Sequence, residues 1–416
     1  MIQSRDAAEA RLLYLGFAFP PGVASLYPNL NPAGHALETQ MISQLRRHFD
    51  IRSVGVLPVE PPEFEAANPA SGIAHDLLLL DKPPELCHRL HSLTRLKNQY
   101  RAWRRTGWEP DLVVVYNLSP IYNQFIAWLR GQSKSPKLVL LLLDSADLGQ
   151  KTRWLKQVRR RFKPMFTPDA EMISCFDACV GLSRTVEQYF QPRQIPFLWM
   201  PGGCTPGRAI TNGASTAPFE RQDSPKFGYF GALGAHAGVK PLVETFLKSN
   251  IAGTLEICGY GKGGDSLAAF NNGHERIRYH GLLSPAECLR FGRSCDVLIN
   301  PRPISHGNEN NFASKLFEYA LCGRAILTSR LSGADSVLGP EALYFDPRDF
   351  EPSLREAFEA IATIPRTELD RRGAAIQERI TGTFSWESQA ARLAGFLKNL
   401  DSPAAAVVER AEALAA

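Results

Sequence analysis

The fold is decided by three consecutive stretches: Asp296-Val-Leu-Ile-Asn-Pro-Arg302, Asn310-Asn-Phe-Ala-Ser-Lys-Leu-Phe-Glu-Tyr-Ala-Leu-Cys-Gly323 and Arg324-Ala-Ile-Leu-Thr328. The first and last are short apolar runs typical of buried strands, and the middle one has the pattern of a helix that ends at a glycine. Strand, loop, helix, turn and strand in this order predict one unit of a parallel sheet. Because ligands bind at the carboxyl ends of parallel strands, we expect Arg302, the helix start at Ser314 and the loop after Thr328 to converge there.

The predicted helix carries a cation, Lys315, and a carboxylate, Glu318, three residues apart. Lys315 and the unpaired N–H groups at the helix start offer positive charge to a phosphate, and Glu318 can accept hydrogen bonds from ribose hydroxyls. The alternative for these two residues is a solvated surface pair that contributes little to stability. The surrounding strands favour a site that holds a sugar nucleotide.

Apolar runs alternate with helix-length stretches along the whole chain. This alternation predicts an α/β protein with two doubly wound, Rossmann-like domains facing a cleft, and a two-substrate enzyme would place one substrate on each wall. We place the first domain at residues 1–204, a linker at 205–224, the second domain at 225–383 and a C-terminal helical segment at 384–416.

The bulk composition, 416 residues with 44% hydrophobic and 21% charged, is that of an ordinary soluble globular protein. The longest apolar runs have the length of strands, so no membrane span is expected. The first nine residues mix charges and lack an apolar core, which predicts no secretory signal and a cytoplasmic location. The eight cysteines lack zinc-site spacing, so we expect buried reduced thiols and no metal.

Positive charge is concentrated in the first half of the chain. Residues 1–200 contain 24 basic and 18 acidic residues, a net charge of +6, against −1 for the remainder. Seven of the thirteen residues in 151–163 are basic, and residues 151–166 read as a basic amphipathic helix, which either lies on an anionic membrane or packs on its own domain. A second basic stretch, 95–105 with Tyr100 and Trp103 interleaved, favours the membrane. No nucleic-acid-binding module is recognisable.

With two α/β domains, a central linker and the helix Phe312-Ala-Ser-Lys-Leu-Phe-Glu-Tyr319, the chain resembles the retaining GT-B glycosyltransferases of the family 4 type, notably bacterial enzymes that build surface polysaccharides. The segment Phe227-Gly-Tyr-Phe-Gly-Ala-Leu-Gly234 is similar to the first strand and glycine loop of their donor domain. The resemblance implies metal-independent, retaining transfer of a hexose from a nucleotide-sugar donor to a glycan or lipid-linked acceptor. It also implies that the C-terminal helix crosses back to the first domain. The basic first domain with its aromatic residues suggests a cytoplasmic enzyme that is peripheral on the inner membrane face.

The resemblance also implies the donor site. Glu318 corresponds to the acid that binds ribose, whereas Asn310 stands where the family has a second acid, which puts an electrostatic role at that position in doubt. The Arg of the family's first loop is replaced by Ala232 or Leu233, and we expect Arg302 to supply that charge. The implied donor-binding residues are Gly231, Lys240, Arg302, Asn310, Asn311, Phe312, Ser314, Lys315 and Glu318.

The implied catalytic residues are Lys315 at the leaving group and Asp144 and His35 in the first domain, with Asp147 as an alternative to Asp144. Retaining enzymes of this fold do not strictly require an enzymic base, and His35 could instead cap the helix that follows it. Two other functions stay open: a sugar-nucleotide epimerase or hydrolase, and a catalytically silent glycan-binding homologue. A nicotinamide site at Gly259-Tyr-Gly-Lys-Gly-Gly264 is disfavoured because no acid follows about twenty residues later.

Overall fold

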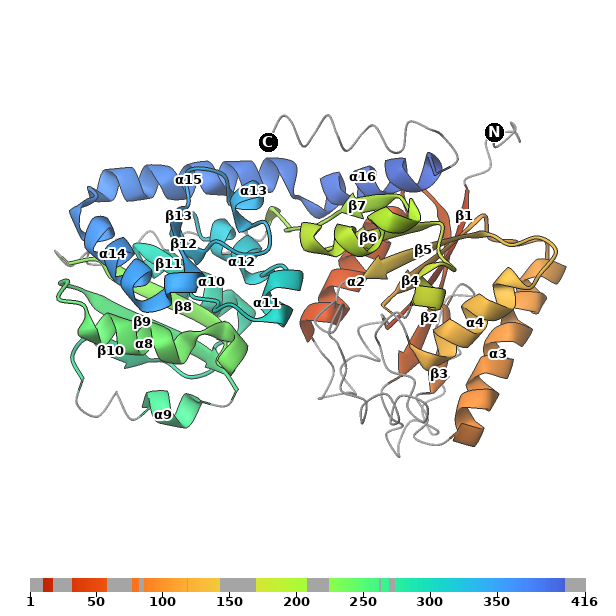
Figure 1. Cartoon of the computed structure of the whole chain (residues 1–416), viewed down its shortest axis with the longest axis horizontal. Coiled ribbons are helices and arrows are strands. Elements are labelled where there is room, and N and C mark those ends of the chain that lie inside the picture. Colours follow the sequence, from red (N-terminus) through yellow and green to blue (C-terminus); the bar gives the residue numbers. More distant parts are fainter. Residues whose placement is uncertain are drawn as a thin grey trace. The chain divides into compact units, whose positions relative to one another are not determined.

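The structure is a computed structural model that describes residues 10–17, 32–57, 77–81, 86–117, 119–142, 170–207, 224–261, 263–268 and 274–400. The chain divides into two compact units (Figure 1). The first unit comprises Met1–Leu182, Val186–Met200 and Ala390–Ala416, and the second comprises Ser183–Thr185 and Pro201–Gln389. Each unit contains one parallel sheet, which confirms the predicted fold class of two Rossmann-like domains.

In the first unit the strand order is β3-β2-β1-β4-β5-β6-β7, and the order reverses beside β1, as in a doubly wound fold. The central strands are almost fully buried, as expected for strands covered on both faces. The described elements are β1 Arg11–Gly16, α2 Pro32–Leu45, β2 Asp50–Leu57, β3 Leu77–Asp81, α3 Leu86–Arg105, β4 Leu112–Tyr116, α4 Pro120–Arg130, β5 Lys137–Leu142, α6 Ala170–Ile173, β6 Ala178–Gly181, two 3-10 helices, Arg184–Tyr189 and Gln191–Arg193, and β7 Phe197–Trp199.

Helix α3 carries the second basic stretch of the sequence. Its cations Arg95, Arg101 and Arg105 are exposed, but Tyr100 and Trp103 are 1% and 4% exposed. Tyr100 packs edge-on against Phe125 of α4 with ring centroids 5.7 Å apart. The interpretation of these two aromatic side chains as support for membrane contact is therefore wrong, because they belong to the core of the first unit.

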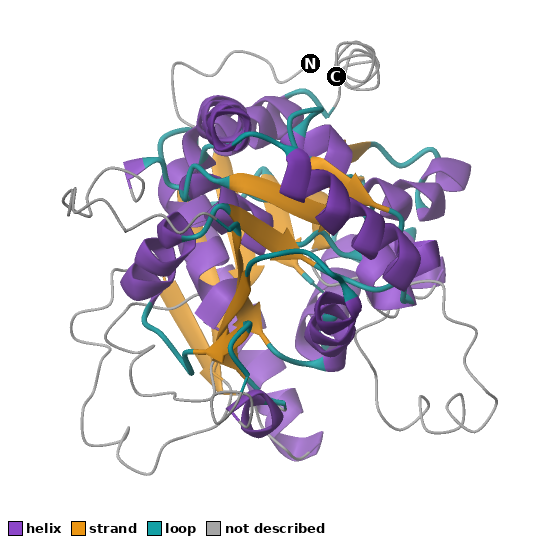
Figure 2. Ribbon diagram, turned by 90° about the vertical axis from the view of Figure 1, so that its left-hand side faces the viewer, coloured by secondary structure: helices purple, strands orange, loops and turns teal. Residues whose placement is uncertain are grey.

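In the second unit the strand order is β10-β9-β8-β11-β12-β13. Helices cover both faces of the strands (Figure 2). In this sheet, α8 and α14 pack on one face and α10 and α12 on the other. The described elements are β8 Lys226–Ala232, the 3-10 helix η4 Ala235–Ala237, α8 Val239–Lys248, β9 Thr254–Tyr260, α9 Gly264–Ala268, β10 Ile277–Tyr279, α10 Pro285–Ser294, β11 Val297–Asn300, α11 His306–Asn310, α12 Lys315–Leu321, β12 Ala325–Ser329, α13 Ala334–Leu338, β13 Leu343–Phe345, a 3-10 helix Pro347–Asp349, α14 Phe350–Thr363 and α15 Arg366–Thr383. The last helix, α16 Trp386–Lys398, begins in the second unit, and its residues from Ala390 onward belong to the first.

A gap between β8 and β11 is filled by a tyrosine of α12. The two strands pair at Val297 and Leu298, opposite Phe227 and Gly228, and the paired stretch ends there. Every second residue of β8 directs its backbone N–H and C=O toward β11. Phe230 is two residues after Gly228, so its N–H and C=O also point to that side, beyond the last paired residue. The hydroxyl of Tyr319 accepts from the Phe230 N–H at 3.2 Å and donates to the Phe230 carbonyl at 3.0 Å. This hydroxyl replaces the missing strand partner and fixes α12 against β8.

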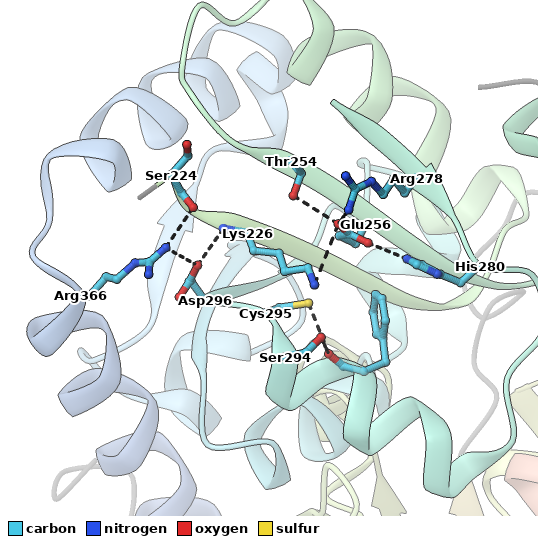
Figure 3. Close-up of polar contacts among 11 residues, drawn as sticks. Ser224, Lys226, Thr254, Glu256, Arg278, His280, Ser294, Cys295, Asp296 and Arg366 are labelled. Carbon is cyan, nitrogen blue, oxygen red and sulfur yellow. Dashed lines mark hydrogen bonds and ion pairs between the residues drawn. The ribbon is translucent and has the colours of Figure 1, made fainter. Parts of the chain in front are cut away.

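The buried carboxylate Glu256, in the first half of β9, is matched by several partners (Figure 3). His280 Nε2 lies 2.6 Å and Arg278 Nη1 3.5 Å from its oxygens, and Lys226 Nζ lies at 4.0 Å. The hydrogen bond from His280 and the nearby cations hold the pKa of Glu256 below its ordinary value against the effect of burial. This part of the second unit therefore compensates its buried negative charge.

The remaining sequence expectations concern membranes and cysteines. Within the described part of the chain, no helix combines the length and the apolar character needed to cross a bilayer. Five of the cysteines whose side chains the structure describes are buried: Cys179, Cys204, Cys258, Cys295 and Cys322. The basic segment 151–166 lies outside the described residues.

We predict that Tyr319→Phe lowers the free energy of unfolding by about 1–3 kcal/mol, because two buried backbone groups of Phe230 lose their partner. Denaturant unfolding measures the loss. The matched control is Tyr344→Phe, which removes a hydroxyl that makes one bond, to the Gly339 carbonyl, at a less buried position. Equal losses in the two variants would contradict the role given to Tyr319.

Candidate functional site

Lys315 begins α12 and reaches the carboxyl end of β8. Its Nζ donates a hydrogen bond to the Tyr229 hydroxyl at 2.7 Å and lies 4.3 Å from the centroid of that ring. Gly231 has a φ of +138°, and a Cβ atom there would lie 3.1 Å from the lysine Nζ. A glycine at this position lets both the backbone and a ligand approach the lysine closely.

Two further nitrogen-bearing side chains interact electrostatically with Lys315. Arg302, in the loop after β11, donates to the Asn311 carbonyl at 2.8 Å, and burial lowers its pKa to about 10. His236, in η4, has its pKa lowered by partial burial and then by the charges of Arg302 and Lys315. Burial and then Arg302 lower the pKa of Lys315 to about 7, against the opposing effect of Glu318. These groups leave a positive region at the carboxyl edge of the sheet.

The positive region has no matched carboxylate. In the described part of the chain, the partners of Lys315 and Arg302 are a phenol oxygen and a backbone carbonyl, unlike the cations around Glu256. Glu318 lies one turn after Lys315 on α12 and is exposed. Because buried charges are costly unless they are paired, this arrangement is chemically suited to an anionic ligand such as a diphosphate.

The loops at this edge are fixed by one another. The Asn308 side chain, in α11, donates to the carbonyls of His236 and Pro303 at 2.9 and 2.8 Å. Gly238 has a φ of +76°, and a Cβ atom there would lie 1.8 Å from the Pro301 carbonyl oxygen. The loops that carry His236 and Arg302 are thus joined by hydrogen bonds and by close backbone packing.

Exposed apolar side chains occur at the carboxyl ends of three strands of the second sheet. Three large apolar side chains of the described chain are exposed: Tyr260 (56%) at the end of β9, Leu282 (73%) after β10 and Ile304 (40%) after β11. Gly259, which precedes Tyr260, pairs with Gly231, and its N–H donates to the Gly281 carbonyl at 2.8 Å. Tyr260 and Leu282 therefore follow strands that lie roughly 5 and 10 Å from the strand of Gly231.

The other expected donor residues are placed as follows. Lys240 is exposed on α8, with its Nζ 3.9 Å from Glu244. Ser314 is exposed at the start of α12 and makes no side-chain capping bond. Phe312 is 4% exposed and packs on Phe317, so it supports the site from inside. Asn310 is also buried, and its Oδ1 accepts from Thr185 at 3.1 Å.

The residues expected to act from the first domain are Asp144, Asp147 and His35. Asp144 and Asp147 lie outside the described residues, and for His35 the structure gives its place in α2 but not its side chain. Their roles stay predictions. His236 of the second unit was missed by the sequence analysis, although a histidine between Gly234 and Gly238 in the loop after a strand was a visible signal.

Glu38 of α2 was also missed. This buried carboxyl accepts from the Tyr14 hydroxyl at 2.9 Å and from the Phe17 N–H at 3.1 Å, and it lies against Gly16 at the end of β1. Burial raises its pKa to about 8. The signal was an acid in the apolar stripe of a helix, because Met41, Ile42 and Leu45 on the same face are buried.

Comparison with solved structures shows similarity over nearly the whole chain. HepE from Anabaena in complex with UDP has a TM-score of 0.62 at 14% identity, covering 94% of this chain and 100% of that one. Sucrose-phosphate synthase from Thermosynechococcus elongatus gives 0.61 at 14%, covering 94% and 99%. The lipopolysaccharide outer core galactosyltransferase WaaB gives 0.60 at 15%, covering 93% and 99%. No curated protein sequence shows significant similarity to the chain.

These similarities show that the chain has the GT-B fold, the two-domain architecture of a large class of glycosyltransferases. A family model agrees with this class. Residues 239–395 match the family model described as glycosyl transferase-like. The matched region contains Arg302, Lys315 and Glu318.

We predict that Glu38→Gln stabilises the protein at high pH. The raised pKa means that the folded state holds a proton that the unfolded state loses above about pH 4.5, so wild-type stability falls as the pH rises toward about 8. Glutamine stays neutral, so the variant should be more stable than the wild type by at least about 1 kcal/mol near pH 9 and differ less near pH 5.

Denaturant unfolding at the two pH values measures this difference, with Glu378→Gln, an exposed carboxylate of α15, as the control. A variant that is less stable than the wild type at both pH values would show that Glu38 is ionised in the folded protein.

Proposed function

We propose that the protein is a retaining, metal-independent hexosyltransferase that moves a sugar from a nucleotide-sugar donor to a glycan or lipid-linked acceptor in polysaccharide or glycoconjugate biosynthesis. The observation that carries this proposal is the pair of cations beside Gly231, Lys315 and Arg302, whose hydrogen-bond partners among the described residues are a phenol oxygen and a backbone carbonyl. A diphosphate supplies the missing negative charge. The similarity of the chain to HepE, whose structure contains UDP, supports a nucleotide as the ligand.

The donor binds along the carboxyl edge of the second unit. Lys315 and Arg302 hold the diphosphate, and Lys240 and the backbone near Ser314 add to the positive field. As the sugar–phosphate bond breaks, negative charge grows on the leaving diphosphate, and fixed cations stabilise it without a metal. Removal of one such charged contact costs about 1.5–3 kcal/mol.

The nucleoside extends from the diphosphate toward α10. Glu318 is exposed on α12, and its charge acts on Cys288 of α10. The Glu318 carboxylate accepts hydrogen bonds from the ribose. The exposed ring of Tyr260 and the side chain of Leu282 offer an apolar surface to the base.

The acceptor binds the first unit. Asp144 orients the acceptor hydroxyl, with Asp147 as the alternative, and His35 contacts the donor sugar or its phosphate. The donor phosphate itself removes the acceptor proton on the same face of the sugar, which gives retention of configuration. The galactosyltransferase WaaB is a lipopolysaccharide enzyme of similar fold, and this supports a glycan or lipid-linked acceptor.

The buried Asn310 supports two alternative functions, a sugar-nucleotide hydrolase or epimerase and a glycan-binding homologue. It replaces an acid of the related enzymes and is bonded to Thr185. A hydrolase or epimerase would convert a sugar nucleotide without an acceptor, and a glycan-binding homologue would bind glycan without any need for Lys315. Product analysis by NMR decides the anomeric configuration of any new linkage.

We predict that one member of a panel of UDP-, ADP- and GDP-sugars binds the wild-type protein and that Lys315→Ala weakens this binding at least tenfold, as expected for a lost charged contact. Isothermal titration calorimetry measures the affinity. Lys248→Ala is the matched control, because Lys248 ends α8 in the same unit and pairs with Glu351 at 2.8 Å. Its affinity should equal that of the wild type.

Lys240→Ala separates the roles of the cations in the same titration. Because Lys240 is exposed, its substitution should weaken binding less than Lys315→Ala does. If no sugar nucleotide binds a folded sample, the donor site is refuted and glycan binding becomes the leading function.

We predict that the protein floats with anionic liposomes at low salt and is released by high salt, because the basic segment 151–166 and the exposed arginines of α3 contact acidic headgroups at the inner membrane face. Neutral liposomes are the control. Absence of flotation at low salt would exclude the membrane as a partner and leave a soluble glycan as the acceptor.

A further inference from the structure

Tyr229 provides the side-chain acceptor of Lys315. It lies in β8, is fully buried, and its hydroxyl donates to the Ala232 carbonyl. The donor proton of the phenol is thereby committed, so the oxygen is free to accept from the Lys315 Nζ at 2.7 Å. The ring face lies 4.3 Å from the same nitrogen. One residue thus fixes the lysine by two contacts.

The chemistry of this acceptor matters because it is neutral. A carboxylate in its place would cancel the charge of Lys315 and compete with a phosphate for it. A phenol oxygen holds the position of the amine, and the ring face attracts a cation, but neither removes the positive charge. The lysine is therefore held at Gly231 in a state in which its charge is available to a ligand.

We propose that Tyr229 is a positioning residue for donor binding, which holds Lys315 beside Gly231 through a neutral contact, so that binding of a sugar nucleotide takes up a proton at this lysine. The proposal rests on the proposed function, because the diphosphate of the donor is the negative charge that drives the uptake. Tyr229 is not among the residues proposed to contact the donor.

The groups around Lys315 set the direction of the effect. Besides burial, Arg302 from the loop after β11 and Glu318 from α12 act on the pKa of Lys315. Tyr229 from β8 accepts its hydrogen bond. Burial, then Arg302 and then the charge of Lys315 lower the pKa of His236 in η4. Burial and then Arg302 lower the pKa of Lys315 to about 7, and Glu318 opposes them. His236, with a lowered pKa, adds little positive charge at neutral pH.

A bound diphosphate raises the pKa of Lys315, so the complex keeps a proton that the free protein has lost above about pH 7. Affinity should therefore be highest below this pH and fall as the pH rises, by up to about tenfold per pH unit. The diphosphate of a sugar nucleotide has no group that titrates near neutral pH, which assigns the proton to the protein.

The first experiment is calorimetry of the tightest-binding sugar nucleotide of the panel, between about pH 6 and pH 9, in buffers of different ionisation enthalpy. Wild type should take up close to one proton near pH 8 and none near pH 6. Tyr229→Phe keeps the ring and loses the acceptor, so its affinity should fall about threefold to tenfold near neutral pH. Its affinity should also begin to fall at a lower pH, because the ammonium form has lost a hydrogen bond.

The matched control is Tyr344→Phe. Tyr344 also donates to a backbone carbonyl, that of Gly339, at 2.7 Å, and also has a cation, Arg330, 4.5 Å from its ring centroid. Loss of its hydroxyl should leave both the affinity and its pH profile unchanged. A Tyr229→Phe profile that matches the wild type, or binding by wild type without proton uptake near pH 8, would overturn the proposal.

The second experiment needs no ligand. The Lys315 signal of ¹³C-lysine-labelled protein, assigned with Lys315→Ala, is followed by NMR against pH. We expect a midpoint near 7 in the wild type and a lower midpoint in Tyr229→Phe. A wild-type midpoint above about 10, the ordinary lysine value, would refute the proposal even if a nucleotide binds, whereas failure of every nucleotide to bind would refute the proposed function separately.

Discussion

The constraint on which the second unit depends is the partial burial of Lys315, whose hydrogen bond among the described residues goes to a neutral phenol oxygen. A cation held away from water is costly unless another charge compensates it. Here the compensation is partial, from a phenol oxygen and an aromatic face. Burial and the charge of Arg302 lower the pKa of Lys315 to about 7, which reflects the remaining cost of its charge. A bound anionic ligand would offset the cost of this charge, so the same feature that destabilises the empty site strengthens ligand binding.

The fold supplies the geometry that this constraint needs. Tyr319 fills the gap between β8 and β11, which places the first turn of α12 over the carboxyl end of β8. Gly238 lets its backbone approach the Pro301 carbonyl at a distance that a Cβ atom would prevent, and Gly231 leaves room beside the Lys315 amine. Around Glu256, by contrast, buried negative charge meets several cations (Figure 3). The same sheet therefore neutralises charge where stability is needed and leaves it uncompensated where a ligand is expected.

Much of this unit could be predicted from the sequence, because a strand, a polar loop, a helix and a second strand follow one another within some thirty residues. The apolar runs located β8, β11 and β12, and the position of Lys315 at the start of α12 followed from the helix pattern. Tertiary contacts escaped the sequence for physical reasons. Periodicity shows neither that the Tyr229 hydroxyl turns toward Lys315 nor that His236 faces the same two cations.

In the first unit, sequence patterns did not show which side chains are buried. Aromatic residues among arginines suggested a membrane surface, but Tyr100 and Trp103 are core residues, because the helical period that exposes the arginines turns the aromatic side chains inward. Glu38, an acid that is 1% exposed, is not marked as buried by its residue type alone. Its place in the apolar stripe of α2 shows that a charged residue type does not exclude burial when hydrogen-bond donors such as Tyr14 and the Phe17 N–H are in reach.

The most direct test of the central claim is a crystal structure of the protein with the tightest-binding sugar nucleotide. The account predicts that a diphosphate oxygen lies within hydrogen-bond distance of the Lys315 Nζ and that the diphosphate contacts Arg302 and the backbone at Gly231. A nucleotide bound elsewhere, with the Lys315 Nζ still bonded to Tyr229 and no phosphate beside it, would contradict the account.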